Sequence, residues 1–205
     1  MNHEQAHRQL ASTDPRLAAL IARSLRYNIK PAWSIRPFDA LAESIAYQQL
    51  SGKAAATIFG RVRALYPKRK WLDPDQILAT PDETFRSAGL SRAKTAALKD
   101  LAAKTIDGTV PSGRVLIRMS DNEIIARLTT VRGIGRWTGE ILLLRMGRPD
   151  MLPADDFGLR SGFRAAYRRR ELPTPRKLRT FAERWRPHRS VASWYLWQAA
   201  NRARQ

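Results

Sequence analysis

The chain has 205 residues, of which 43% are hydrophobic, which is enough for one sizeable globular unit or two small lobes and excludes a disordered chain. Lys and Arg number 37 against 18 Asp and Glu, and the net charge of +19 indicates an anionic partner, nucleic acid before a membrane surface. Packaging proteins are equally basic, so charge alone does not separate an enzyme from a structural nucleic-acid binder.

The predicted elements are nearly all helices, because Ala, Leu and Arg dominate and alternating β-branched patterns are scarce. Asp14 supplies a cap and Pro15 a first helical position, so the first predicted helix runs to about Arg26. Prolines make residues 28–37 a connector. The next helices are predicted over residues 38–50, 53–66, 73–80 and 81–88.

In the second half of the chain, Gly89 ends a helix and Ser91 caps the next one, which runs to about Ile106. A short segment starts at Pro111. The remaining helices are predicted over residues 121–130, 136–146, 155–167, 175–185 and 189–202. The sequence thus predicts about ten to twelve short helices in an all-α fold.

The absence of cysteine excludes disulfides, iron–sulfur clusters and zinc held by thiolates. His3 and His7 fall in an N-terminal segment that we expect to be frayed and solvated, and His188 is remote from them, so no histidine metal site is expected. There is no signal-peptide layout and no apolar run of membrane-spanning length. We expect a soluble intracellular protein, cytoplasmic or nucleoid-associated if bacterial and otherwise nuclear.

The turn Gly133-Ile134-Gly135 is the most informative stretch. Glycines permit positive φ and remove side chains that would block another molecule. The outward-pointing amides of the turn, of Arg136 and of the first helical turn up to Thr138 then form an anion site. An ordinary helix corner is the alternative. On so basic a chain, the apolar residues that frame the glycines favour a hairpin that binds DNA phosphate.

Three blocks of the sequence resemble the helix-hairpin-helix superfamily of base-excision DNA glycosylases, and within it the 3-methyladenine glycosylase II branch. They are the hairpin with the loop and aspartates that follow it, a block that resembles the family's strand-separating loop, and a C-terminal block. They occupy residues 131–160, 43–51 and 182–197. The likeness covers about residues 38–200, without the N-terminal β-rich domain of some members.

The resemblance implies a two-lobed all-α fold with a cleft between the lobes. Residues 38–150 would form a helical bundle that ends in the hairpin. Residues 1–37 would supply a helix and connector that pack with residues 151–205, the lobe that carries the catalytic aspartate. The implied partner is double-stranded DNA with alkylated bases, bound by a monomer. No cofactor is implied except a structural monovalent cation at the hairpin carbonyls.

Asp155 and Asp156 stand together at a predicted helix start. One carboxylate there is usually an N-cap, but with two in a row one can cap while the other faces a cleft. An ionised carboxylate stabilises the oxocarbenium-like state of N-glycosidic hydrolysis and orients the attacking water. By the family position Asp156 is the catalyst and Asp155 its neighbour.

Trp137 stands where superfamily members that also cleave the DNA backbone have a Schiff-base lysine, so the resemblance implies a monofunctional glycosylase. Trp137 and Trp197 match pocket-lining tryptophans, and Tyr47 and Ile141 complete the expected pocket. Aromatic rings favour cationic bases such as 3-methyladenine. A core position is the alternative for Trp137. Ile141 departs from one branch, which has an aromatic residue there, and so leaves the lesion range open.

A flipped base leaves a hole in the duplex that a wedge must fill. By the resemblance Gln48, Gln49, Leu50 and Ser51 form the wedge loop, with Gln49 the best candidate; the alternative is that they only cap a helix.

Two rival functions are a non-catalytic DNA binder, which gains nothing from paired aspartates, and a glycosylase for oxidised or mismatched bases. A basic stretch comes after the aspartates, and some of its residues would contact DNA phosphates. Its members are Arg160, Arg164, Arg168, Arg169, Arg170, Arg176, Lys177, Arg179, Arg184, Arg186 and Arg189.

Overall fold

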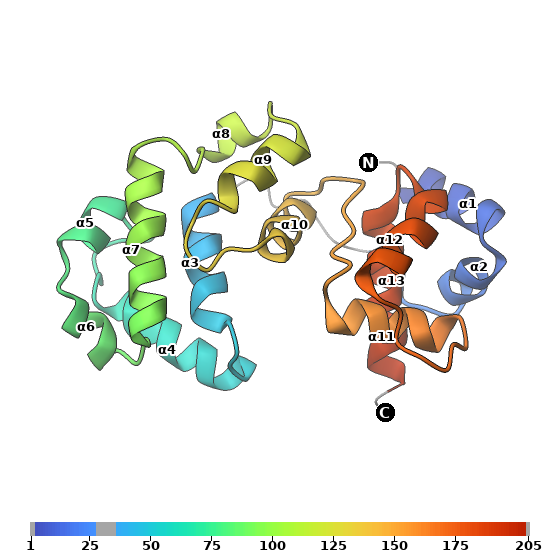
Figure 1. The fold of residues 1–205 in the computed structure, drawn as a ribbon, viewed down its shortest axis with the longest axis horizontal. Coiled ribbons are helices and arrows are strands. Elements are labelled where there is room, and N and C mark those ends of the chain that lie inside the picture. Colours follow the sequence, from blue (N-terminus) through green and yellow to red (C-terminus); the bar gives the residue numbers. More distant parts are fainter. Residues whose placement is uncertain (1–2, 28–35, 204–205) are drawn as a thin grey trace. The chain divides into compact units, whose positions relative to one another are not determined.

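The computed structural model describes residues 3–27 and 36–203 (Figure 1). In these ranges it contains thirteen α-helices, one 3-10 helix and no strand, which confirms the all-α prediction. The chain folds as two compact units. The middle unit is Trp33–Leu142, and the terminal unit combines Met1–Ala32 with Leu143–Gln205. Most of the predicted connector, residues 28–35, lies outside the described residues.

The middle unit is organised around α7 (Arg92–Ile106), which packs against three other helices (Figure 1). These are α3 (Pro37–Tyr47), α5 (Pro74–Ala79) and α6 (Asp82–Ser87). The unit also contains α4 (Gly52–Ala64), α8 (Gly113–Leu116), α9 (Asp121–Leu128) and most of α10 (Arg136–Arg145). Apolar faces of these amphipathic helices make its core, with Leu41, Ile45, Ile77, Phe85, Leu101 and Ile124 fully buried.

The terminal unit is organised around α13 (Arg189–Arg202), whose main partner is α11 (Phe157–Ala166). The two helices approach so closely at Gly162 that a Cβ there would lie 1.8 Å from the carbonyl oxygen of Leu196. The unit is completed by α1 (His3–Thr13), α2 (Pro15–Ala22), α12 (Pro175–Phe181) and the 3-10 helix η1 (Ala182–Trp185). Trp185 is fully buried, and Trp194 packs against the same core.

The expectation of a frayed, solvated N-terminal segment is wrong. Ala6 and Leu10, one helical turn apart, give α1 an apolar stripe, and both are buried. His7 Nε2 lies 3.0 Å from the Tyr195 hydroxyl of α13, and burial lowers the pKa of His7. The ring centroid of His3 lies 4.8 Å from that of Tyr27. The sequence alone does not reveal this short apolar stripe, because α1 is stable only when it packs against the rest of the unit.

Asp14 caps α2 as predicted and is also a buried junction of the terminal unit. Its Oδ1 accepts the backbone N–H groups of Arg16 and Leu17 at 3.2 and 3.1 Å. Its Oδ2 accepts the hydroxyl of Tyr167 at 2.6 Å and the indole N–H of Trp185 at 2.9 Å. Burial, followed by the bond to Asp14, raises the pKa of Tyr167. Four donors compensate the cost of burying this carboxylate.

Three predicted helices differ from the structure by more than two residues at one end or are divided in it. The helix predicted to reach residue 50 ends at Tyr47, because Gln49 has a left-handed φ of 56° that a helix cannot accommodate. The first predicted helix ends at Ala22 instead of Arg26. The helix predicted over 175–185 divides at Phe181 into α12 and η1. The stop at Gly89 and the cap at Ser91 are confirmed.

None of the helices among the described residues is both long and apolar enough to cross a lipid bilayer. Residues 3–27 and 36–203 also contain no group of three or more His, Asp or Glu side chains arranged to hold a metal ion.

Candidate functional site

The hairpin between α9 and α10 has an apolar underside and an exposed glycine face. Val131 and Ile134 are 2% and 3% exposed and anchor the turn. Gly133 is exposed with a φ of +74°, as predicted. Gly135 has no positive φ, and nothing lies within 4 Å of where its Cβ would be. Positive φ is therefore a requirement at Gly133, whereas Gly135 leaves open space in front of the turn.

The helix after the hairpin divides its first residues between surface and interior. Arg136 is half exposed, and its Nε donates to Oε1 of the buried Glu140 at 2.8 Å. Thr138 is buried, so its side chain does not lie on the exposed face of the hairpin. Trp137 is 39% exposed, which argues against the alternative of a core position. Ile141 is partly buried.

The wedge loop, residues 48–51, is in contact with the hairpin. The Gln48 side-chain amide donates to the carbonyl of Gly133 at 2.7 Å, across 85 residues of sequence. Gln49 and Leu50 are exposed, as is the preceding Tyr47. Gln48 is the C-cap of α3 and Ser51 is the N-cap of α4, so the capping alternative holds for these two positions and not for Gln49 or Leu50. The structure therefore joins two predicted DNA-binding segments within the middle unit.

The carbonyls of the hairpin are already engaged by donors of the chain. Thr130 O accepts the ammonium group of Lys104, Gly133 O accepts Gln48, and Val131 O accepts the backbone N–H of Ile134 at 3.0 Å. A carbonyl has two acceptor positions, so these bonds leave room for one more partner each. The structural monovalent cation at these carbonyls remains a prediction.

Asp156 is the N-cap of α11, in the terminal unit. Its Oδ1 accepts the backbone N–H of Leu159 at 2.6 Å and the indole N–H of Trp197 at 2.8 Å. The aspartate that caps the helix is therefore Asp156, the one that the resemblance makes the catalyst, and its chemical role stays a prediction. Asp155 is exposed and pairs with Arg179. The positive end of α11 favours a carboxylate at this place.

Sequence reasoning placed Trp197 in a base pocket but missed its bond to Asp156. The two residues are 41 positions apart and come from α11 and α13, so no local pattern could have revealed the contact. Gly158 belongs to the same arrangement. A Cβ at Gly158 would lie 3.1 Å from Oδ1 of Asp156 and 3.4 Å from Cδ1 of Trp197. The small residue therefore lets the indole reach the carboxylate.

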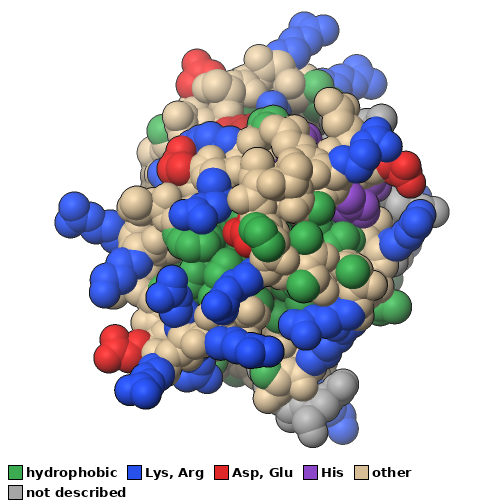
Figure 2. Space-filling model, turned by 90° about the vertical axis from the view of Figure 1, so that its right-hand side faces the viewer, with side chains coloured by type: hydrophobic (Ala, Val, Ile, Leu, Met, Phe, Trp, Pro, Cys, Tyr) green, Lys and Arg blue, Asp and Glu red, His purple; other side chains and the backbone are tan. Residues whose placement is uncertain are grey.

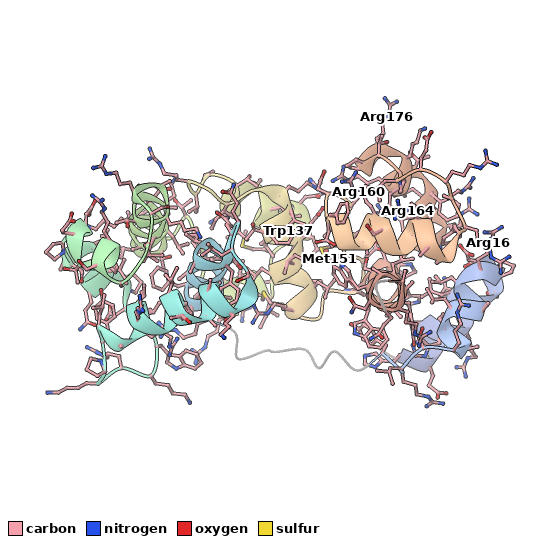
Figure 3. All side chains as sticks on the ribbon, turned by 90° about the horizontal axis from the view of Figure 1, so that it is seen from below. Arg16, Trp137, Met151, Arg160, Arg164 and Arg176 are labelled. Atoms are coloured by element: carbon pink, nitrogen blue, oxygen red, sulfur yellow. The ribbon has the colours of Figure 1, made fainter. Side chains whose placement is uncertain are left out.

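The structure sorts the basic residues that follow the aspartates. Arg179, Arg186 and Arg189 form ion pairs with acidic side chains, and Arg160 donates to the carbonyl of Pro173 at 3.3 Å. Figure 3 shows Arg160 and Arg164 along α11 and Arg176 on α12. The exposed members of the stretch include Arg164, Arg168, Arg169, Arg170, Arg176 and Lys177. Figure 2 shows one face of the molecule, on which Lys and Arg greatly outnumber Asp and Glu.

Comparison with known proteins agrees with this geometry. Residues 42–187 match the family model described as HhH-GPD superfamily base excision DNA repair protein. The chain is 38% identical over 168 residues to DNA-3-methyladenine glycosylase 1 of Schizosaccharomyces pombe, covering 82% of this chain and 74% of that protein.

Solved structures give the same result. The structure of the 3-methyladenine DNA glycosylase of Schizosaccharomyces pombe, in complex with abasic DNA, aligns with a TM-score of 0.83 at 36% identity and covers 94% of this chain and 95% of that one. DNA-3-methyladenine glycosidase from Bacillus halodurans aligns with a TM-score of 0.85 at 31% identity, covering 95% and 88%. The family model spans well over half of the chain, and the chain therefore belongs to the HhH-GPD superfamily of base excision DNA repair proteins.

Proposed function

We propose that this chain is a monofunctional DNA glycosylase that flips alkylated, cationic purines such as 3-methyladenine and 7-methylguanine out of duplex DNA and hydrolyses their N-glycosidic bond. The observation that carries the proposal is Asp156, a carboxylate at a helix N-terminus oriented by Leu159 N–H and by Trp197. Relatives of 38% and 29% identity are named DNA-3-methyladenine glycosylases 1 and 2.

In the proposed reaction the bond between C1′ and the base nitrogen breaks, and its electron pair leaves with the base. A cationic base departs as a neutral molecule, so no acid is needed to protonate it. The Asp156 carboxylate stabilises the positive charge that develops on the sugar. It also orients the water whose oxygen bonds to C1′ and accepts the proton which that water loses. The products are the base and an abasic site.

DNA binding is assigned mainly to the middle unit. The exposed amides around Gly135 would hold a phosphate, and the wedge loop beside them would enter the duplex when the base leaves the stack. Trp137 and Tyr47 supply exposed aromatic surface on the same unit, and the partly buried Ile141 adds apolar surface. The exposed arginines of the terminal unit add attraction to phosphates. We propose that the protein works as a monomer.

Substrate charge tests the proposal directly. We expect release of 3-methyladenine or 7-methylguanine from methylated duplex DNA to be at least about tenfold faster than release of 8-oxoguanine or uracil, because aromatic contacts with a desolvated cation contribute about 2 kcal/mol. The measurement is single-turnover base release, with the products identified by chromatography. The strand should stay intact, since Trp137 offers no amine. Preference for 8-oxoguanine, or a protein–DNA adduct trapped by borohydride, would contradict the proposal.

The hairpin is tested by Gly135→Asp. The open space in front of Gly135 accepts the new side chain without a clash, so the variant should fold, but its charge faces the expected phosphate. We expect affinity for any duplex to fall about tenfold or more, since like charges at an interface cost several kcal/mol. The dependence of affinity on salt should also become shallower. Fluorescence anisotropy across a salt series measures both.

Gly60→Asp is the matched control, because Gly60 lies in α4 and nothing is within 4 Å of where its Cβ would be either. It changes the net charge equally and should alter affinity by no more than about twofold, because Gly60 is exposed and lies outside the segments assigned to DNA. Equal effects of the two substitutions would mean that the hairpin is an ordinary helix corner.

A further inference from the structure

One face of α7 contacts both segments to which DNA binding is assigned, the wedge loop and the hairpin. Lys94, Ala97, Asp100 and Lys104 recur at intervals of three or four residues, which places them on the same side of the helix. The first of them contacts the wedge loop, and the other three lie against the hairpin. All of these contacts lie within the middle unit.

Lys94 holds the end of α3 from which the wedge loop starts. Its ammonium group donates to Ala46 O at 2.8 Å and to Gln48 O at 2.7 Å. The last carbonyls of a helix have no partner in that helix and carry partial negative charge, so a cation there is doubly favourable. The lysine is partly buried, and this burial lowers its pKa. These contacts distinguish Lys94 from a surface lysine whose only role is to keep the protein soluble.

The geometry that Lys94 fixes is strained. Gln49, the residue after Gln48, has a φ of 56°, and this backbone conformation costs a non-glycine residue about 1–2 kcal/mol. Gln48, the residue before it, is held at two points: its carbonyl accepts the ammonium group of Lys94, and its side-chain amide donates to the carbonyl of Gly133. Strain persists only where surrounding contacts over-determine the backbone. These two anchors supply that determination.

The hairpin rests on the following turns of α7. Oδ2 of Asp100 accepts the backbone N–H of Arg132 at 2.7 Å and Lys104 Nζ at 2.9 Å, and Lys104 also donates to Thr130 O. A Cβ at Gly133 would lie 3.5 Å from Cβ of Ala97. The wedge loop and the hairpin are therefore set at a fixed spacing by a single rigid helix.

We propose that Lys94 is a positioning residue for base extrusion: it fixes the wedge loop at the spacing from the hairpin at which the loop enters the duplex beside the gripped phosphate. The proposal rests on the glycosylase function proposed above. Lys94 acts through the loop backbone, so its loss should slow extrusion and leave the affinity for undamaged DNA unchanged.

The experiment compares Lys94→Met with Lys99→Met. Both remove one ammonium group from α7 and keep an apolar stem, but Lys99 points to the other side of the helix, where it pairs with the exposed Asp82. Three quantities are measured for each variant: affinity for undamaged duplex, single-turnover release of a methylated base, and the fluorescence rise of 2-aminopurine placed beside the lesion, which reports unstacking. Lys94→Arg tests rescue, since a guanidinium group can donate to both carbonyls.

We expect Lys94→Met to release base about tenfold more slowly or worse and to lose most of the fluorescence rise. The reason is that hydrogen bonds to a charged group contribute more than those between neutral groups. Lys99→Met should stay within about twofold of the wild type, as for exposed ion pairs. Both should bind undamaged duplex equally, and Lys94→Arg should recover most of the rate. If the methionine variant does not fold, Lys94→Gln, which keeps an amide donor, replaces it under the same criteria.

Equal rates and fluorescence in the two methionine variants would overturn the proposal. So would a loss of rate in Lys94→Met matched by an equal loss of affinity for undamaged duplex, since Lys94 would then be a simple phosphate contact. A wild type that releases no methylated base would instead mark the failure of the proposed function. The fluorescence comparison still decides the role of Lys94 in that case, because it measures unstacking without base release.

Discussion

Asp156→Asn is expected to reduce base release by at least about a hundredfold, in line with the loss of a single group that stabilises transition-state charge. The asparagine oxygen can still accept the N–H groups of Leu159 and Trp197, so the local structure should persist. The substitution removes the negative charge. Affinity for duplex DNA should be unchanged or higher, because a group that repels phosphate has been neutralised. Single-turnover release and duplex affinity are the two measurements.

Asp155→Asn is the control for this substitution. It removes the same charge one residue away, where the side chain is exposed and pairs with Arg179. The release rate should stay within about threefold of the wild type, since exposed ion pairs contribute little. The assignment of Asp156 fails if Asp155→Asn is inactive while Asp156→Asn releases base.

Gly162→Ala should destabilise the terminal unit by about 3 kcal/mol or more, at the upper end of the overpacking range. The added Cβ would meet the backbone oxygen of Leu196 at 1.8 Å, and a backbone atom in the centre of a helix cannot move aside as a side chain can. For a chain of this size the melting temperature should fall by about 6–12 °C. Differential scanning calorimetry measures the shift.

Gly60→Ala provides the comparison, since Gly60 is also a helical glycine but has nothing within 4 Å of a Cβ position. Alanine is the better helix former there, so stability should rise by up to about 1 kcal/mol. A normal melting temperature for Gly162→Ala would show that α11 and α13 can separate without cost. The close approach would then have no part in holding Asp156 beside Trp197.

The sequence predicted most of what depends on local chemistry. The caps at Asp14 and Ser91, the stop at Gly89 and the positive φ at Gly133 all follow from residue types at helix ends. The helical fold was predicted from the composition, and the family from three blocks of sequence that include the hairpin and the paired aspartates. These features need no knowledge of distant parts of the chain.

What the sequence did not predict depends on contacts between residues far apart. The α1 helix packs against α2, α13 and η1, and Lys94 reaches carbonyls that are 48 and 46 residues away. The bond from Trp197 to Asp156 likewise requires two helices to be packed together. The capping role of Asp156 was missed, because spacing does not show which of two adjacent aspartates caps the helix.

The construction of the terminal unit from both ends of the chain has a consequence for folding. Asp14 meets Tyr167 and Trp185 across 153 and 171 residues, and His7 meets Tyr195 across 188. Contacts of such separation form slowly, because a large loop must close before they contribute. During synthesis the middle unit can complete its packing before α11, η1 and α13, the later partners of α1 and α2, have been made. The unit that carries Asp156 is therefore expected to form last, so a stalled nascent chain would present the hairpin proposed to bind DNA without the folded unit that holds the proposed catalytic carboxylate.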